Sequence, residues 1–241
     1  MLDRTRFDLR AIGLGSLAMP LLACACFVGL SLLTALDASQ SGGGGAQAHH
    51  NGATGLLFLL EFGLPPVAGL VAANLIAADP AKELHLSLKR PYAQTMRRRM
   101  ALFTVWSALV STAALIGVQA TGYWIAPQSA PLSQLTWAAP LLWFVGLGSV
   151  LTLLLRSRVG SSAVLGMLWL GELLFRSYLL HNDVLQKLYL FLTASSLAGG
   201  DAPNASYWLA NRLTLIALGL AFLAITSLLL TRNESVLSSE E

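Results

Sequence analysis

The chain has 241 residues, of which 55% are hydrophobic and only 11% are charged, whereas soluble domains are about 25% charged. This composition excludes an ordinary soluble globular protein and leaves room for several membrane-spanning helices of about 20 residues each. The formal net charge of +3 does not indicate a nucleic-acid partner, because twelve of the fifteen basic residues can be assigned to one side of a membrane.

Apolar stretches recur along the whole chain, and we expect six of them to form transmembrane helices. They cover about residues 11–36, 56–78, 100–125, 135–155, 160–180 and 207–231. The predicted fold is an all-α polytopic membrane protein with a single transmembrane domain over residues 1–241. The first stretch stays apolar well beyond Cys24, which favours a retained span over a cleaved lipoprotein signal.

The segment between the first two spans, residues 37–54, is polar and rich in glycine, and it contains no Lys or Arg. This pattern predicts a flexible loop outside the cytoplasm. His49 and His50 in this segment are expected to be solvated. Cys24 and Cys26 lie two residues apart and would point to different faces of a helix. We therefore predict no metal site.

The second span carries Glu61, Asn74 and the pair Pro65-Pro66. Polar side chains inside a membrane face a protein interior or water. The prolines remove backbone donors and should bend or open the helix. Two interpretations of Glu61 and Asn74 stay open: they line a transport pathway or subunit interface, or they form internal polar pairs that fix helix packing.

The longest polar run, residues 79–99, follows the second span and holds six of the fifteen Lys and Arg residues. This density of positive charge is typical of a cytoplasmic loop. Leu84, Leu86 and Leu88 alternate with polar residues before Pro91. The pattern favours a short helix lying on the membrane surface, and a solvated connecting loop is the alternative.

The later spans add three features. The third is rich in Ala, Ser, Thr and Gly, which allow close helix packing. The fifth ends with Glu172 and Arg176, which are four residues apart and can pair on one helix face. The apolar run 184–192 is too short to cross a bilayer and predicts a re-entrant or interfacial helix.

The distribution of basic residues predicts the topology. Only Arg176, Lys187 and Arg212 fall outside the cytoplasm if the six spans alternate in direction. The other twelve then lie inside, together with both termini: Arg4, Arg6, Arg10, Lys82, Lys89, Arg90, Arg97, Arg98, Arg99, Arg156, Arg158 and Arg232. Such a distribution follows the positive-inside rule. It predicts a multi-pass protein of a bacterial plasma membrane.

Soluble catalytic signatures are absent from the sequence, which contains no P-loop, GxSxG, HExxH or CxxC motif. One string, Glu172 to Leu179, resembles the first motif of the CAAX-protease family, which reads EExxFRxxL. Gly171 stands in place of the first glutamate, and His181 is the only histidine that follows. A protease-like protein is therefore one alternative function, and a non-transporting membrane scaffold is another.

The layout of the whole chain resembles the permease subunits of ABC-2 type transporters. In many of these, the loop after the second span has an acidic residue, a leucine-rich run, a proline and then basic residues. The matching positions here are Asp79, Glu83, Leu84, Leu86, Leu88, Pro91 and Arg97 to Arg99. The run 184–192 matches their re-entrant outer helix, and Trp208 to Arg212 open the last span as in many such permeases.

The resemblance implies a mechanical role without catalytic residues in this chain. Two copies of an ABC ATPase subunit would bind ATP and Mg²⁺ and push a coupling helix, and a second permease subunit, identical or related, would complete the transporter. The residues implied in coupling are Glu83, Arg90, Pro91, Tyr92, Arg97, Arg98 and Arg99. Anchoring to lipid headgroups is the alternative role for the arginines. Glu61, Asn74, Glu172 and Arg176 are the implied polar residues of the pathway or interface.

Overall fold

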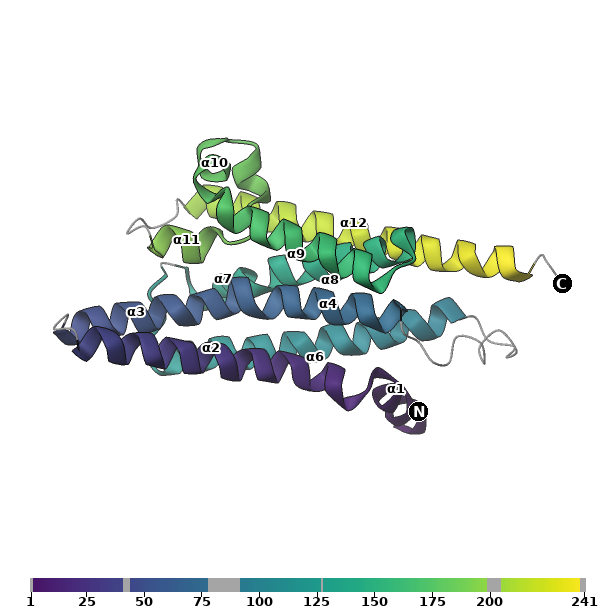
Figure 1. Cartoon of the computed structure of the whole chain (residues 1–241), viewed down its shortest axis with the longest axis horizontal. Coiled ribbons are helices and arrows are strands. Elements are labelled where there is room, and N and C mark those ends of the chain that lie inside the picture. The colour runs from purple at the N-terminus through teal and green to yellow at the C-terminus, as the bar shows by residue number, and fades with distance from the viewer. Residues whose placement is uncertain (1, 41–43, 78–91, 127, 199–204, 239–241) are drawn as a thin grey trace.

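The computed structural model describes residues 2–40, 44–77, 92–126, 128–198 and 205–238, which form an elongated helical bundle without strands (Figure 1). The elements are α1 (Leu2–Ile12), α2 (Leu14–Gln40), α3 (Gly44–Phe58), the π-helix η1 (Leu59–Gly63), α4 (Leu64–Ala77), α6 (Tyr92–Ala120), α7 (Ala130–Ser133), α8 (Leu135–Leu155), α9 (Arg158–Leu174), α10 (Arg176–His181), the 3₁₀-helix η2 (Leu185–Leu188), α11 (Leu192–Ala198) and α12 (Ala205–Ser238). The all-α prediction is confirmed.

Five helical segments of the described chain are long and apolar enough to cross a membrane. They are Leu14–Asp37, Gly45–Ala77, Tyr92–Ala120, Ala130–Leu155 and Ser206–Arg232. Many of their apolar side chains face outward, notably along α2 and α12. Exposed apolar surface on this scale is typical of contact with lipid. The chain is thus consistent with a multi-pass membrane protein.

The fifth predicted span, residues 160–180, is not a continuous helix. Helix α9 ends at Leu174 after 17 residues, and the backbone leaves helical geometry at Phe175, where φ is −95° and ψ is 17°. The six-residue helix α10 then begins at Arg176. This break is why the described chain has five membrane-length segments instead of the expected six.

The prediction of a flexible loop over residues 37–54 was wrong for most of that range. Helix α2 continues to Gln40 and α3 begins at Gly44, so most of the polar segment is helical. Helices α2 and α3 pack closely: a Cβ atom placed on Gly55 would lie 2.5 Å from the Ser31 hydroxyl. Two of the polar side chains pair one helical turn apart, since Gln47 Nε2 donates to Asn51 Oδ1 at 3.0 Å.

The apolar run 184–192 does not form the single helix that was predicted. It contains the 3₁₀-helix η2, an extended residue at Tyr189 and the start of α11. We call residues 185–198 the outer hairpin. Figure 1 shows α11 and α10 at the end of the bundle opposite α1.

Helix α8 lies between α4 and α12, and glycines set both contacts. A Cβ atom on Gly148 would lie 2.6 Å from the Gly69 carbonyl oxygen, and one on Gly146 would lie 2.7 Å from the Gly219 carbonyl oxygen. Small residues were also expected to promote close packing of the third span. Gly117 of that span does not do so as the glycines of α8 do, since a Cβ atom there would meet nothing within 4 Å. Close helix approach therefore occurs around α8 as well as between α2 and α3.

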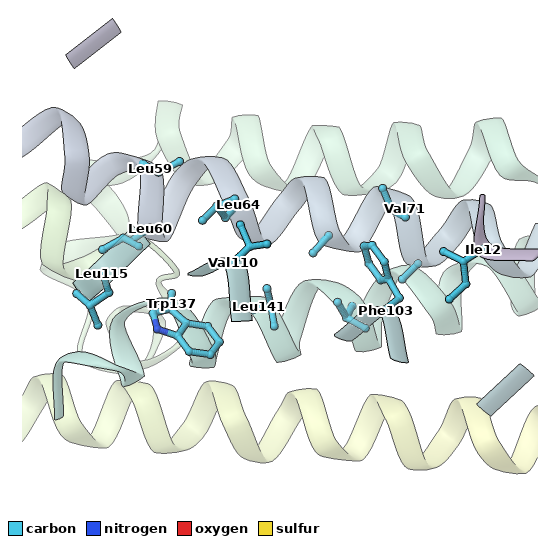
Figure 2. Packing of buried hydrophobic residues seen from close by; sticks show 13 residues of the cluster. Ile12, Leu59, Leu60, Leu64, Val71, Phe103, Val110, Leu115, Trp137 and Leu141 are labelled. Carbon is cyan, nitrogen blue, oxygen red and sulfur yellow. The ribbon is translucent and has the colours of Figure 1, made fainter. Parts of the chain in front are cut away.

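The main apolar core lies among η1, α4, α6 and α8 (Figure 2). Phe103 and Leu115 of α6 are fully buried there, and Leu60 and Leu64 contribute from the other side. Trp106 adds a polar link, because its Nε1 donates to the Leu17 carbonyl of α2 at 2.9 Å. The core thus holds α6 against the first two membrane segments.

Replacing Gly148 with alanine should destabilise the fold, because the new methyl group would collide with the backbone of α4. Such overpacking costs about 1–3 kcal/mol. The free energy of unfolding in a mixed-detergent titration would measure the loss. Gly117→Ala is the matched control and should not lower stability, since it adds a methyl group to open space. Equal losses in both variants would contradict the packing role of Gly148.

Candidate functional site

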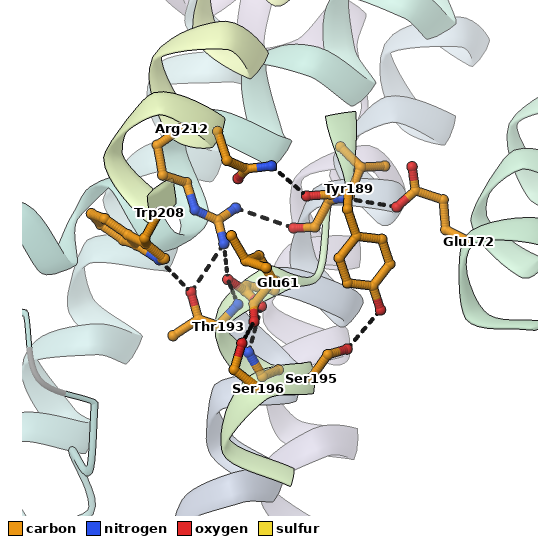
Figure 3. Close-up of polar contacts among 12 residues, drawn as sticks. Glu61, Glu172, Tyr189, Thr193, Ser195, Ser196, Trp208 and Arg212 are labelled. Atoms are coloured by element: carbon orange, nitrogen blue, oxygen red, sulfur yellow. Dashed lines mark hydrogen bonds and ion pairs between the residues drawn. The ribbon is translucent and has the colours of Figure 1, made fainter. Parts of the chain in front are cut away.

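An ion pair between Glu61 of η1 and Arg212 of α12 lies inside the bundle, and neither side chain is exposed (Figure 3). Two oppositely charged groups from segments 151 residues apart meet here. Removing charges from water is costly, so a buried pair persists only where further hydrogen bonds satisfy both groups. The residues around the pair provide these bonds to both carboxylate oxygens and to two of the three guanidinium nitrogens, and the buried Arg212 Nε has no partner among the described residues.

Local sequence explains the position of Glu61. Pro65 and Pro66 have no N–H group to donate to the carbonyls four residues earlier, those of Glu61 and Phe62. The helix widens there into the π-turn η1. Trp169 of α9 occupies one vacated acceptor, because its Nε1 donates to the Phe62 carbonyl at 3.1 Å. The opening of the helix that the prolines predicted therefore occurs.

The Glu61 carboxylate binds the outer hairpin as well as Arg212. Its Oε1 accepts a hydrogen bond from the Thr193 backbone N–H at 3.1 Å, and its Oε2 accepts one from Ala194 at 2.8 Å. These N–H groups lie at the start of α11 and have no acceptor within the helix. A single carboxylate thus joins the second membrane segment, α12 and the outer hairpin.

Arg212 is held by a complementary set of groups. Its Nη1 donates to the Leu190 carbonyl at 3.1 Å, and its Nη2 donates to the Thr193 hydroxyl at 3.0 Å as well as to Glu61. The same hydroxyl accepts from Trp208 Nε1 at 2.8 Å. The guanidinium carbon lies 5.5 Å from the centroid of the Trp208 ring, within range of a cation–π contact.

Asn211, the neighbour of Arg212, fixes the other arm of the outer hairpin. Its Nδ2 lies within 3.0 Å of three carbonyl oxygens, those of Gln186, Lys187 and Tyr189. The Tyr189 hydroxyl in turn pairs with the Ser195 hydroxyl at 2.6 Å. Successive residues of α12 therefore hold a segment whose own regular structure is limited to the short helices η2 and α11.

Glu172 and Arg176 do not pair with each other, although their spacing allows it on a continuous helix. The break at Phe175 separates them. Glu172 Oε2 accepts a hydrogen bond from the Leu190 backbone N–H at 2.8 Å, and Arg176 donates to the Ser195 carbonyl. Both residues therefore bind the outer hairpin from the α9–α10 side.

Asn74 lies at the opposite end of the bundle from this network. It is half-buried and lines a pocket together with Arg99 and Arg158. The structure therefore separates the four predicted pathway residues into three that contact the outer hairpin and one that does not. Glu61 has no exposed area, so it lines no open pathway in this conformation.

Three of the arginines predicted to contact an ATPase, Arg97 to Arg99, lie in the first turns of α6, and each has a partner within the chain. Arg97, which is exposed, donates to the Ser227 hydroxyl of α12 at 3.1 Å. Asp8 of α1 lies 2.5 Å from Arg98 and 3.7 Å from Arg99. Tyr92 is the first residue of this helix. The remaining coupling residues, Glu83, Arg90 and Pro91, lie outside the described residues.

Arg212 is the central residue that sequence reasoning missed. It was assigned as one of three outward cations, although it lies within the last apolar stretch just as Glu61 lies within the second. Two opposite charges in different spans are a signal of pairing, because each is too costly to bury alone. Thr193 and the hairpin carbonyls carry no comparable sequence signal.

The residues of this network connect η1, α9, α12 and the outer hairpin. Among the described residues there is no group of three His, Cys, Asp or Glu side chains that could hold a metal ion. The one histidine after the CAAX-like string, His181, is exposed, and its Nδ1 lies 2.6 Å from the Ser177 carbonyl. Comparison with known proteins adds no assignment: no family model, no curated protein and no solved structure matches the chain.

Replacing Arg212 with glutamine should destabilise the protein strongly, because the Glu61 carboxylate would stay buried without its cation. Breaking a buried pair in this way costs about 3–5 kcal/mol. Adding Glu61→Gln should recover part of the loss, with a coupling energy on the order of 1–3 kcal/mol. Reversible unfolding in mixed detergent measures all three variants. Strictly additive losses would contradict a direct interaction between the two side chains.

Replacing Asp8 with asparagine should release α1 from the start of α6, since Asp8 is shared by Arg98 and Arg99. Hydrogen–deuterium exchange should then increase in peptides covering residues 2–12 and 92–99, while α8 and the outer hairpin stay protected. Asp37→Asn, which removes an exposed carboxylate, is the control. Unchanged exchange in α1 would show that the ion pairs do not hold it.

Proposed function

We propose that this chain is the transmembrane permease subunit of an ABC-2 type transporter in a bacterial plasma membrane. In this proposal it moves substrate outward and performs no catalysis. Two copies of a separate ATPase subunit bind ATP and Mg²⁺, and a second permease subunit, identical or related, completes the pathway. The resemblance in layout supports this assignment, and three properties of the structure are compatible with it.

The proposal requires six crossings. Helices α9 and α10 together provide the fifth, residues 158–181, with the break at Phe175 inside it, and the outer hairpin takes the place of the re-entrant element. An even number of crossings returns the chain to the side on which it began. Figure 1 agrees with this requirement, because α1 and the C-terminal half of α12 lie towards the same end of the bundle.

The charges also support this orientation, in which both termini are cytoplasmic. Two of the three basic residues assigned to the outer side are neutralised or hydrogen-bonded within the protein. Arg212 pairs with Glu61, and Arg176 donates to the Ser195 carbonyl. Lys187 is then the remaining exposed cation of the outer side. The distribution of twelve basic residues inside and three outside itself follows the positive-inside rule, which counts Lys and Arg and not net charge.

The observation that supports a coupling role best is the way the first turns of α6 are attached. They follow directly on the predicted coupling segment, and they are joined to α1 through Asp8 and to α12 through Ser227. A force applied to that segment would therefore act on three helices together. A solvated connecting loop would not need such attachments.

The same attachments suggest how movement crosses the membrane. Arg97 contacts the cytoplasmic half of α12, and Arg212 near the other end of α12 contacts Glu61 and the outer hairpin. A helix transmits displacement along its axis because its backbone is continuously hydrogen-bonded. ATP-driven closure of the ATPase subunits would then shift α6 and α12 and reposition the outer hairpin.

The proposal predicts that the tagged full chain, purified in a gentle detergent, brings with it a stoichiometric nucleotide-binding subunit with ATPase activity. Changing Glu83 and Arg90 together to glutamine should abolish this co-purification, because both lie in the predicted coupling segment. Arg156→Gln alters an exposed basic residue of another predicted cytoplasmic turn and should leave the complex intact.

Mass spectrometry of the co-purified chains and an ATPase assay give the readout. A chain that purifies alone and without ATPase activity would overturn the permease assignment in favour of a non-transporting scaffold. Loss of the subunit in Arg156→Gln as well as in the double variant would contradict the assigned coupling segment.

A further inference from the structure

A pocket of about 290 Å³ lies at the end of the bundle that carries α1, apart from the Glu61–Arg212 network. Its walls come from the junction of α1 and α2, from α4, from the start of α6 and from the start of α9. Four elements distant in sequence therefore converge on one concave surface. None of the residues around the outer hairpin contributes to it.

Two arginines line this pocket. Arg99 is 2% exposed, and its Nε lies 3.7 Å from the Asp8 carboxylate. Arg158 is exposed at the first position of α9, and no hydrogen bond or ion pair joins its side chain to another residue of the described chain. Two guanidinium groups in one pocket attract an anion, and their planar donor arrays match phosphate oxygens.

The remaining polar wall can also donate hydrogen bonds. Gly15 and Ser16 belong to the first turn of α2, whose first backbone bond joins Leu17 N–H to the Gly13 carbonyl. The N–H groups before Leu17 therefore have no acceptor within the helix. Asn74 contributes an amide whose buried oxygen has no partner among the described residues, and an amide can present its NH₂ group by rotation.

The rest of the lining is apolar and continues onto a lipid-facing surface. Val71 and Leu75 of α4 and Met19 of α2 complete the pocket, and Met19 is itself exposed. The outer face of α2 beyond it carries exposed leucines at positions 21 and 22. A ligand with an anionic head and an apolar tail would thus find both parts of its structure matched.

We propose that this pocket binds the phosphate of an anionic phospholipid headgroup, held by Arg99 and Arg158 with the first turn of α2, while the acyl chains lie along α2. The volume is about ten times the roughly 30 Å³ occupied by a water molecule in the liquid. It therefore accommodates a phosphate group with its glycerol. Bound lipid would bridge α1, α4, α6 and α9 and hold this end of the bundle together.

The experiment is a titration of the purified full chain with phosphatidylglycerol, followed by native mass spectrometry. Arg158→Gln should weaken lipid binding about fivefold, the effect of losing one basic residue near an anionic lipid. Arg156→Gln is the matched control, because it removes the same charge two residues away and outside the pocket. Equal weakening in both variants would overturn the proposal by showing a general charge effect.

A second pair of variants tests the pocket without changing charge. Gly15→Leu places a side chain in open space within the pocket, and Gly29→Leu places one in open space elsewhere on α2. The first should abolish the binding that is sensitive to Arg158, and the second should not. Binding that survives Gly15→Leu would overturn the proposed location.

Inorganic phosphate distinguishes the two sources of the anion. If millimolar phosphate leaves phosphatidylglycerol binding unchanged, the ligand is the lipid. If phosphate displaces the lipid from the wild type and binds Arg158→Gln more weakly, the site is an anion site for a free phosphate, and the lipid assignment is overturned. Neither result depends on an ATPase partner, so the outcome is separate from that of the proposed transport function.

Discussion

The ion pair between Glu61 and Arg212 is the constraint on which the outer half of the structure depends. In a low-dielectric interior neither charge is tolerated alone, and the pair is tolerated only with further hydrogen bonds to its polar atoms. Those bonds come from Thr193, Ala194 and the Leu190 carbonyl. The irregular outer hairpin is therefore ordered by the need to satisfy two buried charges, since it has too few helical residues to be stable alone.

The backbone of the second membrane segment explains how Glu61 is directed towards α12. Two consecutive prolines open the second membrane segment at the point where Glu61 lies, and the freed Phe62 carbonyl is taken by Trp169. The carboxylate is thereby aimed across the bundle towards α12. Helix α8 lies between α4 and α12. Glycine contacts on both of its sides bring α4 and α12 close enough for the pair to form. Prolines one turn after Glu61 and glycines on α4, α8 and α12 therefore determine whether the charges can meet.

Sequence reasoning reached the all-helical, membrane-spanning architecture because that information is local. The predicted apolar stretches overlap α2, α4, α6, α8 and α12, and α8 has the predicted limits. Sequence reasoning failed where tertiary contacts decide the local structure. The glycine-rich segment 44–54 is helical because it packs on α2, and the fifth span is broken because Glu172 and Arg176 bind the hairpin. Glu61 was recognised as costly to bury, but its partner Arg212 was not.

Two of the polar attachments of α12, those of Arg97 and Arg212, lie at opposite ends of the bundle and differ in strength. At one end, exposed Arg97 holds Ser227 through a single hydrogen bond that water can replace at little cost. At the other, Arg212 is fully buried, and loosening it would leave charges unsatisfied. Movement between α6 and α12 is thus easier near Arg97 than near Arg212. Under the proposed coupling, a shift of α12 would be accommodated near Arg97, while Arg212 would keep α12 joined to Glu61 and the outer hairpin.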